Sequence, residues 1–115
     1  MTNDSALLPF QRLDIYRVAR ELAVAVSEAG IRHTELRDQA SRASISAFLQ
    51  LSEGLPNDGA GMRRKYFTES NNSLHETMAA VDLATAIGAL DAAVADRIQH
   101  LGLRFKRMLW KLRAG

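Results

Sequence analysis

The 115-residue sequence contains no cysteine and only two prolines. The lack of cysteine excludes disulfides and thiolate-bound metal ions. No apolar run approaches the ~20 residues that a membrane-spanning helix needs. The N-terminus, MTNDSALLPF, has neither the basic segment nor the apolar core of a signal peptide. We therefore expect a cytoplasmic protein with no membrane association.

An excess of charge of one sign is also missing, because 15 basic residues face 13 acidic ones and the net charge is +2. This balance alone does not indicate a nucleic-acid-binding protein, so the distribution of charge along the chain matters more. The 47% hydrophobic and 24% charged content is typical of a globular protein. A chain of this length suits one domain with a modest core, to which self-association could add buried surface.

Abundant alanine and the absence of β-branched runs favour helices throughout. Residues 1–10 read as a flexible leader, and residues 11–115 as one domain. Within it, a single apolar stripe predicts a first helix from Gln11 that Gly30 ends. Thr34 is a candidate N-cap for a second helix over 35–53, which Gly54 closes.

The segment LPNDGAG, at 55–61, predicts a loop, and a third helix follows over about 61–87. Asp91 is a candidate N-cap for a fourth helix. Its apolar residues are spaced as an a/d heptad seam: Val94, Ile98, Leu101, Phe105, Met108 and Leu112. Four helices joined by short loops predict an all-α, antiparallel up-down-up-down four-helix bundle.

The second helix has more than one apolar face. Small residues, including Ala40, Ala43 and Ala47, lie on one side, and bulky apolar residues lie on the other. A bundle monomer needs one apolar stripe per helix, so the surplus indicates either one broad core or an interface between copies. We favour homo-oligomerisation through the second and third helices. The candidate interface residues are Arg42, Ile45, Phe48, Leu49, Glu53, Phe67, Leu74, Glu76 and Met78.

Catalytic and metal motifs are weak. Ser44, Ser46 and Ser52 lie inside a predicted helix without a G-x-S-x-G motif, so we expect them to pack helices or to bond to the preceding turn. The three histidines form no Glu-x-x-His motif of a di-iron bundle. We expect no enzyme activity, metal or cofactor, and a bundle enzyme or metal-binding protein remains a minor alternative.

Basic residues gather in two places. Arg63, Arg64 and Lys65 open the third helix, whereas Arg104, Lys106, Arg107, Lys111 and Arg113 crowd the last turns of the fourth without an acid among them. Cations at a helix C-terminus interact favourably with the helix dipole and stabilise the helix. They also suit a phosphate-binding surface, on which Trp110 could stack bases.

Two segments resemble a known family. LRDQASRASISAFLQLSEG resembles the second-helix signature of bacterial four-helix-bundle proteins encoded in intervening sequences of large-subunit ribosomal RNA genes. The matching residues there are Leu36, Gln39, Arg42, Ala43, Ser46, Glu53 and Gly54. YFTESNNSLHE is similar to the family's second signature through Ser73, Leu74 and Glu76. The resemblance extends from about Phe10 to Leu112.

The resemblance implies a left-handed bundle that assembles into a ring of five subunits. The family includes accessory subunits of diversity-generating retroelements, which bind a reverse transcriptase and nucleic acid. The first hypothesis is therefore a non-enzymatic oligomeric scaffold that contacts RNA, DNA or a nucleic-acid enzyme. The alternative is a protein–protein interaction module without a nucleic-acid role.

Overall fold

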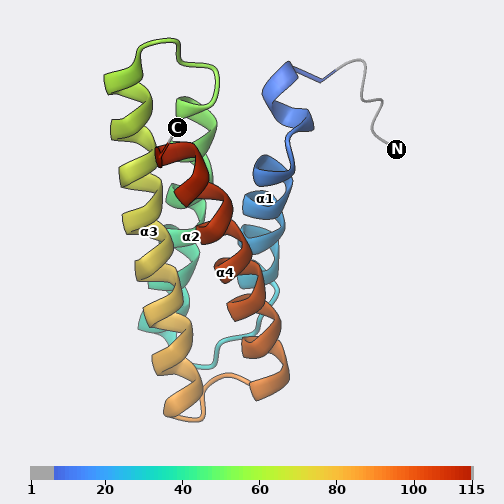
Figure 1. Ribbon diagram of the computed structural model, residues 1–115. Helices are drawn as coiled ribbons and strands as arrows, with labels where there is room; N and C mark the ends of the chain where they lie inside the picture. The colour runs from blue at the N-terminus through green and yellow to red at the C-terminus, as the bar shows by residue number, and fades with distance from the viewer. Residues whose placement is uncertain (1–6, 115) are drawn as a thin grey trace.

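The computed structural model describes residues 7–114, which form an all-α four-helix protein. A short 3-10 helix, η2 (Pro9–Arg12), precedes α1 (Asp14–Ser27), α2 (Thr34–Gly54), α3 (Ala60–Ala86) and α4 (Ala92–Ala114). Consecutive helices run in opposite directions (Figure 1). The predicted helical class and helix number are confirmed. Of the predicted leader, residues 1–6 lie outside the described residues, and Pro9 and Phe10 belong to η2.

Two glycines close the helices at one end of the bundle. Gly30 and Gly88 have φ angles of +70° and +78°, a left-handed conformation that glycine adopts without the penalty of a Cβ atom. Arg32 connects the loop between α1 and α2 to the loop between α3 and α4 at this end of the bundle. Its guanidinium donates to the carbonyl of Gly88 at 3.0 Å and to the carboxylate of Asp91 at 3.2 Å. Its backbone N–H donates to the carbonyl of Ala89 at 2.8 Å.

The N-cap of α2 differs from the sequence-based expectation. Nδ1 of His33 accepts the backbone N–H of Leu36 at 3.2 Å, so His33 is the N-cap and Thr34 is the first helical residue. The prediction of Thr34 as the cap was therefore wrong. An imidazole nitrogen provides the acceptor that a hydroxyl or carboxylate usually provides at this position.

The core lies along the axis of the bundle and is filled from all four helices. Its largest fully buried apolar side chains are Phe67, Phe105, Leu22, Leu51, Leu74, Ile98 and Leu109. The heptad seam predicted for α4 is only partly correct. Val94, Met108 and Leu112 are half-buried, whereas Leu109 is completely buried. Because α4 contacts both α1 and α3, it buries a stripe broader than an a/d seam.

The most extensive helix–helix contact joins α2 and α3. The small-residue face of α2 is buried there, with Ala40, Ala43 and Ala47 at most 3% exposed. Small side chains let the two backbones approach closely, and Ser70 Oγ donates to the carbonyl of Ala47 at 2.7 Å. The small-residue face therefore belongs to the core of the subunit and is not an interface between copies.

Two candidate interface residues are corrected by this packing. Phe67 and Leu74 are each 1% exposed and pack in the core of their own chain, so neither is an exposed interface residue. Three small residues of α3, Ser70, Thr77 and Ala84, are buried too. The α3 helix has a broad buried surface because it packs on both α2 and α4.

We expect Gly54→Ala to lower the free energy of unfolding by about 1–3 kcal/mol, the usual cost of overpacking a core. A Cβ atom at Gly54 would lie 2.7 Å from the buried ring of Phe67. Gly61→Ala is the matched control, since nothing lies within 4 Å of a Cβ atom there. It should stabilise α3 by up to about 1 kcal/mol through helix propensity. Urea denaturation of both variants measures the difference, and equal stabilities would contradict the close packing at Gly54.

Candidate functional site

The outer side of α4 carries a basic face near its C-terminus, formed by Arg104, Arg107 and Lys111. All three are exposed, and Trp110 beside them is 68% exposed. Their spacing of three and four residues places them on one side of the helix. Within residues 7–114, none of the three basic side chains has a hydrogen bond or ion pair. This basic face is therefore available to an anionic partner.

The other two basic residues of α4 are oriented differently. Lys106 Nζ lies 2.6 Å from Nε2 of His75 on α3, so Lys106 lies at the junction of α3 and α4. Arg113 is half-buried and lines a small cavity of about 170 Å³ together with Arg63 and Arg64. The five basic residues of α4 are thus divided into two groups. Arg104, Arg107 and Lys111 face the solvent, whereas Lys106 and Arg113 lie next to α3.

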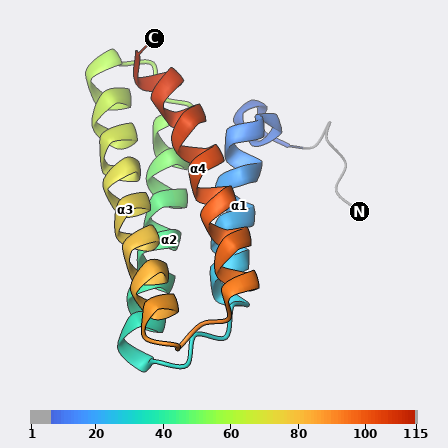
Figure 2. The same ribbon diagram turned by 60° about the horizontal axis from the view of Figure 1, so that its bottom comes forward.

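Arg63 has a structural role. Its Nη1 donates to the carbonyls of Leu55 at 3.1 Å and Asn57 at 3.4 Å, and its guanidinium lies 5.2 Å from the centre of the Phe67 ring. These contacts hold the loop between α2 and α3. Arg64 and Lys65 are exposed instead. The first turn of α3 and the last turns of α4 lie at the same end of the bundle (Figure 2), so the fold brings the two basic clusters together.

The bulky apolar face of α2 is only partly free. Ile45 and Leu49 are 49% and 52% exposed. Phe48 is half-buried, because its ring lies 5.0 Å from that of Tyr16 on α1, which in turn contacts Phe10. Phe48 therefore joins α1 to α2, and its place at an interface between copies stays a prediction.

The polar candidates for the interface lie around the α2–α3 contact. Arg42 and Glu53 are exposed, and Arg42 Nη2 donates to Oε1 of Gln39 at 3.3 Å. Gln39 Nε2 donates to Glu76 at 3.4 Å, so Glu76 has a partner within its own subunit. Met78 is half-buried and packs over Gly102 of α4.

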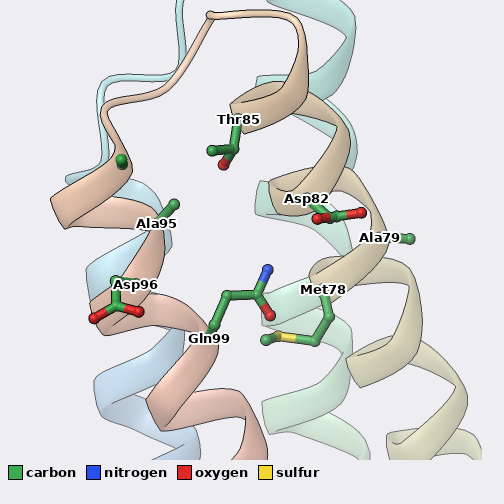
Figure 3. A pocket seen from close by; sticks show the side chains of 8 residues that line it. Met78, Ala79, Asp82, Thr85, Ala95, Asp96 and Gln99 are labelled. Atoms are coloured by element: carbon green, nitrogen blue, oxygen red, sulfur yellow. The ribbon is translucent and has the colours of Figure 1, made fainter.

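A groove between α3 and α4 was not predicted from the sequence. We call it the α3–α4 groove. One part of it has a volume of about 580 Å³ and is lined by Leu74, His75, Met78, Ala79, Gln99, Gly102, Leu103 and Lys106. The second part, about 490 Å³, shares Met78, Ala79 and Gln99 and continues toward the loop between the helices (Figure 3). The small residues Ala79, Ala95 and Gly102 along the two helices are the feature of the sequence that could have indicated this groove.

No metal centre is found among the described residues, since they contain no group of three or more side chains able to hold an ion. Asp96 lies 3.6 Å from His100, and both side chains are exposed. Two of the three serines bond to their own helix, as expected. Ser44 and Ser52 donate to the carbonyls of Ser41 and Phe48, at 3.1 and 2.9 Å. Ser46 exchanges a hydrogen bond of 3.0 Å with Ser73 across the α2–α3 contact.

The fold and these surfaces define a class of protein, the small four-helix bundle, and no helix among the described residues is long and apolar enough to cross a membrane. The chain belongs to the 23S rRNA-intervening sequence protein family, whose family model matches residues 11–111. The resemblance inferred from the two signatures is therefore confirmed. No match was found among curated protein sequences.

We expect Arg63→Ala to lower the free energy of unfolding by about 1–3 kcal/mol, because two carbonyls lose a charged donor. Arg64→Ala removes the same charge from an exposed neighbour and should change stability by less than about 0.5 kcal/mol. Thermal unfolding of the two variants gives the comparison. A loss that is equal for both would show that Arg63 does not support the loop between α2 and α3.

Proposed function

We propose that this protein is a non-enzymatic, cytoplasmic scaffold that forms a homo-oligomer and contacts RNA or DNA through the basic face of α4. The nucleic acid could be bound directly or together with an enzyme that acts on it, such as a reverse transcriptase. The observation that carries this proposal is the basic face itself: Arg104, Arg107 and Lys111 lie on one side of one helix without acidic partners within residues 7–114.

The chemistry of the basic face suits a polyanion. Guanidinium and ammonium groups bind phosphate oxygens, and each neutralised phosphate releases condensed counterions. Trp110 offers an exposed aromatic surface next to these cations, on which an unpaired base can stack. Arg64 and Lys65 are exposed residues near the start of α3, which lies at the same end of the bundle as the last turns of α4 (Figure 2), and they extend the positive charge there.

Oligomerisation would strengthen such contacts. A single subunit has a net charge of only +2, so binding by one basic face is expected to be weak. A ring repeats that face once per subunit, and several weak contacts made together give high avidity. The ring of five that the family resemblance implies is the assembly we propose. The exposed apolar residues Ile45 and Leu49 support self-association.

A protein–protein interaction module without a nucleic-acid role is the second candidate. The α3–α4 groove favours it, since an apolar groove of this size can accept a helix from another protein. The two candidates differ in their response to salt.

Fluorescence anisotropy with labelled single-stranded RNA and DNA, over a range of salt concentrations, tests the proposal. Affinity should fall steeply with salt, and the variant Arg104→Ala/Arg107→Ala/Lys111→Ala should lower the slope of log affinity against log salt by about 2. Arg12→Ala/Arg20→Ala/Arg37→Ala removes the same charge from other exposed sites and is the control. No binding at about 50 mM salt, or equal effects of the two triple variants, would favour the second candidate.

A further inference from the structure

Four exposed residues of α2 form a ridge with charge at each end. Arg42, Ile45, Leu49 and Glu53 are spaced by three, four and four residues, so they follow one side of the helix. We call them the α2 ridge. Its centre is apolar and about half exposed, its first residue is a cation and its last is an anion. The carboxylate of Glu53 has no hydrogen bond or ion pair within the described residues.

The α3–α4 groove has the opposite pattern. Asp82 and Asp96 lie on either side of its end near the α3–α4 loop (Figure 3). The apolar side chains of Met78 and Leu103 lie in the part beyond them, and His75 and Lys106 line that part as well. The groove therefore runs from an acidic end through an apolar centre to a basic end.

The lengths and directions of the two features also agree. Arg42 and Glu53 are 11 residues apart, or about 16 Å along a helix, and Asp96 and Lys106 are 10 residues apart, or about 15 Å. The α2 and α4 helices run in the same direction in the bundle (Figure 1). In two copies related by rotation about an axis parallel to the bundle, the ridge of one copy therefore meets the groove of the next with opposite charges aligned.

We infer that the α2 ridge of one copy docks into the α3–α4 groove of a second copy. In this register Arg42 lies near Asp96, Leu49 lies near Leu103, and Glu53 lies near Lys106. The ridge is on the exposed side of α2, opposite its buried residues, and the groove is between α3 and α4. Two different surfaces meet, so the contact is head-to-tail and repeats from copy to copy until a ring closes. This inference rests on the proposed homo-oligomer and specifies its contact.

Light scattering after size exclusion tests the docking, with Leu49→Asp as the first variant. The wild-type mass should be a multiple of the 12.7 kDa chain, and Leu49→Asp should shift it to the monomer, with at least a tenfold weaker association. Val24→Asp on α1 is the matched control, because Val24 is 49% exposed and lies outside both ridge and groove. Circular dichroism checks that both variants remain folded.

Charge reversal tests the register. Glu53→Lys and Lys106→Glu should each weaken association several-fold, and the two changes together should restore it to within about threefold of the wild type. The pairing would be overturned if the single reversals left association unchanged. It would also be overturned if the loss of association free energy in the double variant equalled the sum of the two single losses.

Because the chain lacks cysteine, cross-linking tests the head-to-tail arrangement directly. Leu49→Cys/Leu103→Cys should give a ladder of disulfide-linked species under mild oxidation, whereas each single variant should not. Efficient cross-linking of Leu49→Cys alone would indicate a symmetric contact and overturn the inference. A wild-type oligomer whose mass Leu49→Asp leaves unchanged would overturn the docking alone. A monomeric wild type would overturn the proposed homo-oligomer as well.

Discussion

The close packing of α2 on α3 is the constraint on which the rest of the structure depends. Alanine on one helix and serine and threonine on the other leave little side-chain volume between the two backbones. The buried hydrogen bond from Ser70 to the carbonyl of Ala47 and the contact of Gly54 with Phe67 require this short separation. Because α2 uses its small residues for this contact, its bulky apolar residues must lie elsewhere. The surplus face of α2 is thus a consequence of how the subunit packs.

The fourth helix packs less closely on α3 than α2 does, and this difference creates the second surface. Gly102 leaves room that the end of Met78 fills, and small residues along both helices leave the α3–α4 groove open. A subunit with a ridge on α2 and a groove between α3 and α4 has two unlike surfaces. Such a pair suits repeated head-to-tail association, because the ridge of one copy matches the groove of the next in charge order.

Charge is arranged so that one end of the bundle is the more basic. The last turns of α4 carry cations that interact favourably with the helix dipole. The antiparallel fold places the first turn of α3 at the same end of the bundle (Figure 2). Arg63 belongs to a basic cluster in the sequence, but its guanidinium donates to carbonyls of the loop between α2 and α3 and so has a structural role. The exposed cations that remain would act together in the proposed oligomer, because the net charge of one chain is small.

The sequence by itself determined the number of helices, their approximate bounds and the family, because helical periodicity and glycine stops are local properties. It also determined that α2 has two apolar faces. Only the tertiary structure decided that the small-residue face contacts α3 and that Phe67 and Leu74 are core residues. It also decided that the ring of Phe48 packs against that of Tyr16 on α1. These outcomes depend on which helices are neighbours and how closely they approach. The burial of Leu109, the role of Arg63 and the α3–α4 groove arise from contacts between residues far apart in the chain, which helical periodicity alone does not encode.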